Sequence, residues 1–244
     1  MIGFGTYKLT KDEAYHMTIK ALKMGYRNID TAELYNNEKM VQKAIVDSGI
    51  NRDDIFLTTK ISTKDPSKIA KSFMKRLRIF PKINLLLLHW PSTDHVCGWK
   101  ILTELLQQYK EQVDNIGISN ISLPILKEII EKTGIVPYAI QNEINPFCFD
   151  LELETFCKNK NIKIIAHSCF SFGKALEFDE IKILANGNQI TPANILLRWV
   201  KKHCDIYLTR CNEDKFLQEN YEISESMDYI DIKSDKKFRL YYNK

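Results

Sequence analysis

The chain has 244 residues, of which 44% are hydrophobic and 27% are charged, and its formal net charge is +4. This composition excludes a disordered chain and is typical of a globular protein with a sizeable core. The small positive charge does not indicate a nucleic-acid partner, and no segment resembles a secretion signal or reaches the roughly 18 apolar residues of a membrane span. Six scattered cysteines predict neither a disulfide framework nor a metal site. We therefore expect a soluble, cytoplasmic protein without nucleic-acid or membrane partners.

Strand-like and helix-like segments alternate along the chain. Thr10 and Glu13 have the spacing of a capping box, and Gly25 stands where the first helix should stop. Residues 83–91 are apolar almost throughout, which is typical of a strand buried on both faces of a parallel sheet. Strands are predicted at residues 2–7, 26–30, 55–60, 83–91, 113–120, 138–146, 162–168 and 205–210. Helices are predicted at residues 11–24, 37–48, 67–79, 99–110, 122–133, 151–160, 192–203 and 214–220.

Two segments depart from this alternation. Residues 171–189 carry apolar side chains at irregular spacing and are predicted to form a long loop with a short helix. Residues 221–244 are predicted to form a C-terminal segment. Its basic end, residues 233–244, is interpreted as a solvated tail rather than a polyanion-binding arm.

The eight strand and helix units follow one another without a linker rich in Pro, Gly or Ser. This pattern predicts an α/β protein with a single (β/α)₈ barrel domain over residues 1–244. An open doubly wound sheet is the alternative, but the G-x-G-x-x-G fingerprint of a nucleotide-binding sheet of that kind does not occur. The first predicted strand begins almost at residue 1, so we expect a barrel without an N-terminal hairpin across its bottom.

Ionisable side chains stand at the predicted ends of three consecutive strands. Asp30, Lys60 and His89 end these strands, and Tyr35 lies five residues after Asp30. Each residue alone is better explained as a turn, strand-end or core residue. Together they indicate a site, because a barrel brings the carboxyl ends of its strands to one rim.

The chemistry that these four residues support is carbonyl reduction. A free phenol has a pKa of about 10, and a nearby ammonium that is held by a carboxylate lowers it. We therefore interpret Tyr35 as the general acid, Lys60 and Asp30 as its supports, and His89 as a hydrogen-bonding group for the carbonyl oxygen. Such a reaction also needs a hydride donor.

The chain resembles the aldo-keto reductase family over nearly its whole length. The resemblance is carried, in the family's order, by GFGTYKL, GYRNIDTAELYNNE, FLTTKI, LLLLHWP, IGISN, QNEINP, ITPANILLRWV and LQEN. It implies that Asp30, Tyr35, Lys60 and His89 are catalytic, and that a monomeric enzyme uses NADPH to reduce a small carbonyl substrate. The implied cofactor contacts are Thr6, Ser119, Asn120, Gln141, His167, Ser168, Arg210, Glu219 and Asn220. The implied substrate contacts are Tyr7 and Trp90.

Two positions depart from the family pattern. His167 stands where the family usually has a tyrosine stacked under the nicotinamide, and Phe216 replaces an arginine that helps to hold a phosphate. Arg210 keeps one cation there, so NADPH is expected and NADH remains the open alternative. The loop after His89 is short, which suggests an open pocket. The competing functional hypothesis is a barrel that binds a nucleotide or a partner without efficient turnover.

Overall fold

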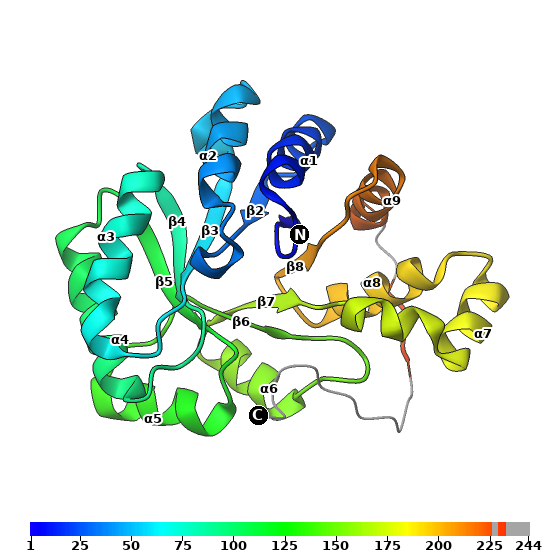
Figure 1. Cartoon of the computed structure of the whole chain (residues 1–244). Helices are drawn as coiled ribbons and strands as arrows, with labels where there is room; N and C mark the ends of the chain where they lie inside the picture. The colour runs from blue at the N-terminus through cyan, green and yellow to red at the C-terminus, as the bar shows by residue number, and fades with distance from the viewer. Residues whose placement is uncertain (226–228, 233–244) are drawn as a thin grey trace.

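Eight parallel strands close into a barrel in the order of the sequence, and the last strand is hydrogen-bonded to the first (Figure 1). The computed structural model describes residues 1–225 and 229–232, so the predicted basic tail at 233–244 lies outside the described residues. The strands are β1 (Ile2–Gly5), β2 (Asn28–Asp30), β3 (Phe56–Ile61), β4 (Ile83–Leu88), β5 (Val113–Ser119), β6 (Ala139–Glu143), β7 (Lys163–His167) and β8 (Ile206–Thr209). The predicted (β/α)₈ barrel is confirmed.

Helices surround the strands and connect each one to the next (Figure 1). They are α1 (Lys11–Met24), α2 (Glu38–Asp47), α3 (Ile69–Ile79), α4 (His95–Gln108), α5 (Leu123–Thr133), α6 (Leu151–Asn159), α7 (Asp179–Asn188), α8 (Pro192–Lys202) and α9 (Asp214–Glu225). Short 3₁₀ turns are η1 (Glu33–Tyr35), η2 (Arg52–Asp54), η3 (Pro66–Lys68) and η4 (Ser171–Glu177). No described helix is both long enough and apolar enough to cross a membrane.

The leucines of β4 are buried on both faces of the strand. Leu85 and Leu87 are buried in a cluster with interior residues of β6, β7 and β8. Leu86 and Leu88 belong instead to the larger cluster formed between the strands and the helices. A strand in this position therefore needs apolar side chains at every residue. Gly117 on β5 provides room in this wall, because a Cβ there would lie 2.1 Å from the carbonyl oxygen of Ala139.

The predicted helix boundaries are confirmed where capping chemistry marks them. The Thr10 hydroxyl accepts the Glu13 N–H at 3.2 Å, and the Glu13 carboxylate accepts the Thr10 N–H at 2.8 Å. Gly25 and Gly134 end α1 and α5 with positive φ angles of 117° and 71°. The sequence places α4 four residues too late, because Asp94 caps its true first turn by accepting the Cys97 N–H.

Residues 171–189 are more regular than the long loop with a short helix that the sequence predicted. The segment contains η4 followed by the ten-residue helix α7, which buries Ile181 and Ala185 against α8 and its neighbours. The final helix is also longer than predicted, so the expected C-terminal segment at 221–244 begins inside α9. The reason is packing: Ile223 is buried, and the Tyr221 ring lies 5.3 Å from the ring of Tyr26.

Candidate active site

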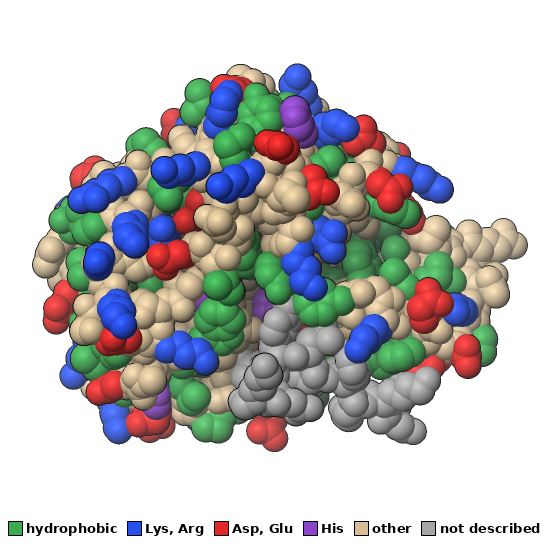
Figure 2. Space-filling view, in the orientation of Figure 1, with side chains coloured by type: hydrophobic (Ala, Val, Ile, Leu, Met, Phe, Trp, Pro, Cys, Tyr) green, Lys and Arg blue, Asp and Glu red, His purple; other side chains and the backbone are tan. Residues whose placement is uncertain are grey.

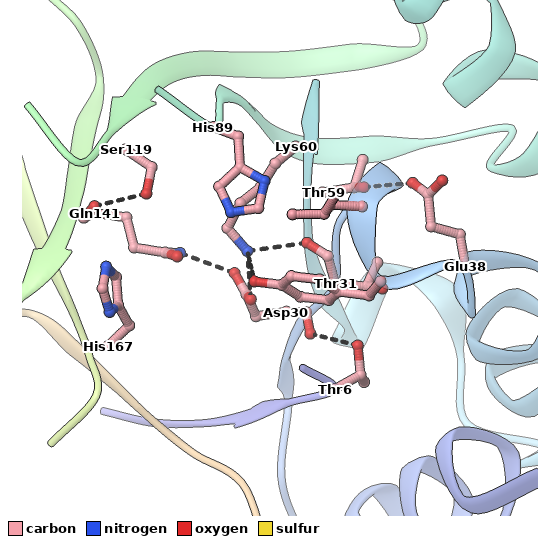
Figure 3. Close-up of polar contacts among 12 residues, drawn as sticks. Thr6, Asp30, Thr31, Glu38, Thr59, Lys60, His89, Ser119, Gln141 and His167 are labelled. Carbon is pink, nitrogen blue, oxygen red and sulfur yellow. Dashed lines mark hydrogen bonds and ion pairs between the residues drawn. The ribbon is translucent and has the colours of Figure 1, made fainter. Parts of the chain in front are cut away.

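Lys60 lies at the centre of the polar network at the carboxyl end of the barrel (Figure 3). Its side chain projects from β3 and is fully buried, and its Nζ lies 2.5 Å from Oδ1 of Asp30 at the end of β2. The same ammonium donates to the carbonyl oxygen of Thr31 at 3.0 Å and to the hydroxyl of Tyr35 at 3.4 Å. Burial lowers the pKa of Lys60 below its ordinary value, and the Asp30 carboxylate opposes that shift. The predicted contacts among Asp30, Lys60 and Tyr35 are thus present.

The Asp30 carboxylate is held from two sides. Lys60 contacts one carboxylate oxygen, and Gln141 Nε2 on β6 donates to the other at 2.8 Å (Figure 3). The Ser119 hydroxyl at the end of β5 donates to the carbonyl oxygen of Gln141 at 2.8 Å. Four strands therefore contribute to one connected network. In the sheet register Ser119 pairs with Gln141, whereas Lys60 lies two residues beyond Thr58, the partner of Asp30.

The His89 ring follows β4 and faces the same network. It is 6% exposed, it stacks on Trp90 with 4.0 Å between ring centroids, and it meets the Tyr35 ring edge-on at 5.7 Å. Burial lowers the pKa of His89 to about 2, and the charge of Lys60 and the nearby His167 add to this effect. The ring is therefore neutral at physiological pH, which makes it a hydrogen-bonding group rather than a proton reservoir.

Asn120 and His167 form a second polar group beside the first. Asn120 Nδ2 donates to the carbonyl oxygen of His89 at 2.9 Å and to the Ser119 hydroxyl at 3.1 Å, so Asn120 Oδ1 is free to accept from His167 Nε2 at 3.1 Å. His167 Nδ1 lies 3.0 Å from the Ser168 hydroxyl. Burial lowers the pKa of His167 to about 3, with a further contribution from Lys60. The predicted His167 is therefore a neutral, oriented ring beside the amides.

A cavity of about 670 Å³ opens above these groups. Figure 2 shows the hollow among apolar side chains, with acidic and basic side chains interspersed over the rest of that face. Most of the predicted site residues line the cavity, namely Tyr7, Asp30, Tyr35, His89, Trp90, Ser119, Asn120, Gln141, His167, Ser168, Arg210, Glu219 and Asn220.

Two predicted site residues lie outside the cavity wall. Lys60 does not line the cavity but contacts Asp30 and Tyr35, which do. Thr6 was expected among the cofactor contacts, but it is fully buried, and its hydroxyl donates to the carbonyl oxygen of Asp30 at 3.1 Å. Asn37 fixes this arrangement by donating to the Thr6 carbonyl oxygen at 2.9 Å, instead of capping α2 with its side chain. Thr6 and Asn37 therefore support β2 from below the site.

The other end of the cavity, at β8 and α9, is open and basic. Arg210 follows β8, and Lys215 and Phe216 lie in the first turns of α9; all three are exposed and line the cavity. Cations at this end suit the phosphates of a dinucleotide, and the hydroxyl and amide groups near Asp30 suit a polar ring substituent. The cavity residues thus fit an extended nicotinamide dinucleotide. Within the described residues, no cluster of His, Cys, Asp or Glu could hold a metal ion.

Sequence reasoning missed the contribution of η4 to the cavity. Phe172 lies in this turn with a positive φ of 56°, its ring centroid is 6.2 Å from that of Tyr7, and Lys8 Nζ lies 4.7 Å from the Phe172 ring. No local pattern signals such a conformation for a phenylalanine. Lys215 was also missed, although the helical spacing of residues 215, 216, 219 and 220 places them together on α9.

Comparison with known proteins agrees with this architecture. The sequence profile of the Aldo/keto reductase family matches residues 1–233. The chain therefore belongs to the aldo/keto reductase family, whose members are NAD(P)H-dependent oxidoreductases.

Named relatives and solved structures are similar over most of the chain. The aldehyde reductase YPR1 of Saccharomyces cerevisiae is 31% identical over 91% of this chain and 82% of its own length. The methylglyoxal reductase DkgB of Escherichia coli O157:H7 is 34% identical over 81% of this chain and 76% of its own. The crystal structure of a Gox0644 mutant in complex with NADPH superposes with a TM-score of 0.83 at 29% identity, covering 94% of this chain and 84% of that chain.

Proposed function

We propose that this enzyme reduces a small aldehyde or ketone to the corresponding alcohol, and that Tyr35 supplies the proton. The observation that carries the proposal is the position of Lys60 Nζ, which contacts both the Asp30 carboxylate and the Tyr35 hydroxyl inside a buried network. A buried ammonium next to a phenol favours the phenolate form, so it eases loss of the phenolic proton. Tyr35 lines the cavity, where a substrate oxygen can accept that proton.

The neighbouring residues have separable roles in this proposal. His89 is neutral, so its ring can donate a hydrogen bond to the carbonyl oxygen and polarise it without a net charge. Tyr7 and Trp90 form aromatic walls beside Tyr35 and His89, where they would contact the substrate. The apolar character of these walls favours a compact carbonyl compound over a highly charged one.

We further propose NADPH as the cofactor, which supplies the hydride when it is bound. Ser119, Asn120 and Gln141 would hold its carboxamide beside the reacting groups, and His167 with Ser168 would lie next to the nicotinamide. Arg210 and Lys215 would contact its phosphates, and Glu219 and Asn220 would contact the adenosine half. The similarity to a structure that holds NADPH supports this choice over NADH.

The proposed activity is tested by mixing the purified protein with NADPH and a panel of aldehydes that includes methylglyoxal, the substrate in the name of the DkgB relative. We expect loss of nicotinamide absorbance that depends on the aldehyde, and formation of the alcohol by mass spectrometry. Calorimetric binding of NADPH without turnover of any aldehyde would instead support a barrel that only binds its nucleotide.

We also infer a monomer that works in a reducing, cytoplasmic environment. The six cysteines, all within the described residues, form no disulfide bond with one another, and four of them are buried. Sedimentation velocity tests the monomer directly, and a species of twice the mass at micromolar concentration would contradict it.

A further inference from the structure

Ser62, which directly follows β3, connects the turn that carries Tyr35 to the His89 ring. The Leu34 N–H in η1 donates to the Ser62 hydroxyl at 3.2 Å, and the same hydroxyl lies 3.2 Å from Nδ1 of His89. The Ser62 N–H donates to Glu33 Oε2, also in η1, at 3.1 Å. One serine therefore contacts both the turn of the proposed proton donor and the proposed carbonyl-polarising ring.

The η1 side of this connection is anchored by a buried charge network. Glu33 accepts from Arg76 at 2.8 Å and from Ser72 at 2.5 Å, both on α3. Burial alone would raise the pKa of Glu33, but the hydrogen bonds from Ser72, Arg76 and Ser62 hold it below its ordinary value. Arg76 is 4% exposed and also contacts Glu38 at 3.1 Å. Glu33, which accepts from the Ser62 N–H, is thus fixed to helix α3.

The hydrogen-bonding capacity of the Ser62 hydroxyl favours one tautomer of His89. A neutral imidazole carries one N–H, and a hydroxyl has one donor and two acceptor sites. Among the described residues, the hydroxyl has two partners, the Leu34 N–H and His89 Nδ1. If His89 donated from Nδ1, the hydroxyl would accept two hydrogen bonds and its own proton would have no acceptor among these partners, whereas acceptance at Nδ1 satisfies that proton as well. A ring that accepts at Nδ1 carries its proton on Nε2, the nitrogen remote from Ser62.

We propose that Ser62 is a positioning residue that fixes His89 as the Nε2–H tautomer and directs this N–H to the substrate carbonyl oxygen. The proposal rests on the proposed carbonyl reduction for its catalytic consequence, but the tautomer itself is a property of the protein alone. Because η1 also contains Tyr35, the same contacts keep the proton donor and the hydrogen-bond donor in register.

The test combines a spectrum that needs no substrate with a kinetic measurement. ¹⁵N spectra of histidine-labelled protein, with His89→Gln used to assign the signals, should show a protonated Nε2 and a hydrogen-bonded Nδ1 for His89. In Ser62→Ala the Nδ1 signal should shift and the Nδ1–H tautomer should appear. With an aldehyde, kcat/KM should fall roughly tenfold, because one donor to the developing oxyanion is only partly populated. The Kd for NADPH should stay unchanged.

Two further variants keep the test decisive. Ser62→Thr retains the hydroxyl and should retain both the spectrum and most of kcat/KM. Ser67→Ala removes an exposed hydroxyl that donates to Asp65, so it should change neither. A wild-type spectrum with His89 protonated on Nδ1, or an unchanged spectrum in Ser62→Ala, would overturn the proposal, whether or not the enzyme reduces aldehydes. If Ser62→Ala does not fold, the wild-type spectrum alone decides.

Discussion

At the β2–β4 end of the cavity, Asp30 and Lys60 are buried, paired with each other and bonded to further groups. At the β8–α9 end, Arg210 and Lys215 are exposed side chains of the cavity wall. In the first region the charges of Asp30 and Lys60 neutralise each other within the protein. The second region presents cations that suit the negative charge of a ligand. Preorganised dipoles and charges cost no reorganisation during reaction, while exposed cations adapt to what they bind. Substitutions in the first region should therefore change turnover and stability, whereas substitutions in the second should change cofactor affinity.

The largest effect is expected from Lys60→Met, which keeps the bulk of the side chain but removes its charge. Asp30 would then be a buried carboxylate without its ion pair, so we expect a loss of about 3–5 kcal/mol in the free energy of unfolding. Activity should fall at least about 100-fold, because Tyr35 also loses its neighbouring ammonium. Urea denaturation and steady-state kinetics measure the two effects.

A surface lysine provides the matched control for that variant. Lys20 contacts Asp214 at 2.6 Å between exposed side chains, so Lys20→Met should leave stability and activity almost unchanged. Equal losses of stability in Lys60→Met and Lys20→Met would mean that the buried pair has no special role.

A smaller effect is expected when the pH is lowered. The pKa values of His89 and His167 are lowered to about 2 and about 3, so between pH 6.5 and about 3 the unfolded chain binds protons that the folded chain does not. The contribution of these neutral rings to the free energy of unfolding is fully present above pH 6.5. It is lost as the pH falls, by up to about 1.4 kcal/mol per pH unit for each ring.

Urea denaturation between about pH 7.5 and 5.5 measures this slope. His89→Gln should reduce the slope, whereas His16→Gln should not, because His16 is exposed on α1. An identical slope in the wild-type protein and in His89→Gln would show that His89 takes up its proton at the same pH in the folded and the unfolded chain.

The smallest effects are expected at the open end of the cavity. Arg210→Ala should weaken NADPH binding about tenfold, the value of one charge-assisted contact, with little change in stability. Arg78→Ala, which removes an exposed arginine from α3, serves as the control. Phe216→Arg should shift preference further toward NADPH by a few-fold, because it adds a third cation beside Arg210 and Lys215. Calorimetry with NADPH and NADH measures both, and equal effects of Arg210→Ala and Arg78→Ala would remove Arg210 from the site.

The sequence predicted the residues at the strand ends better than the contacts made by the connecting turns, for physical reasons. Asp30, Lys60 and His89 stand on or next to buried strands, and closure of the barrel alone brings such positions together. The capping residues Thr10 and Gly25 likewise have local chemistry that fixes helix ends. These features depend on short-range preferences or on the barrel geometry, and both can be predicted from a single sequence.

Other features depend on contacts between distant residues and were not predicted. Thr6 is buried because Asn37 binds the chain after β1, and α9 extends past residue 220 because Ile223 packs against the core. Phe172 reaches the cavity through a positive φ angle that its sequence does not favour. Ser62 has no recognisable motif, and its role follows only from its two hydrogen bonds with Leu34 and His89.

The most direct test of the proton donor is a single-turnover reaction of the preformed NADPH complex with a reactive aldehyde, comparing the wild-type protein with Tyr35→Phe. We expect the rate of nicotinamide oxidation to fall by about 10²–10⁴-fold in Tyr35→Phe, with a Kd for NADPH within about threefold of the wild-type value. Tyr15→Phe removes a hydroxyl that donates to Asp47 at 2.7 Å and does not line the cavity. This variant should react at the wild-type rate. A rate in Tyr35→Phe equal to that of Tyr15→Phe would contradict the role of Tyr35 as the acid.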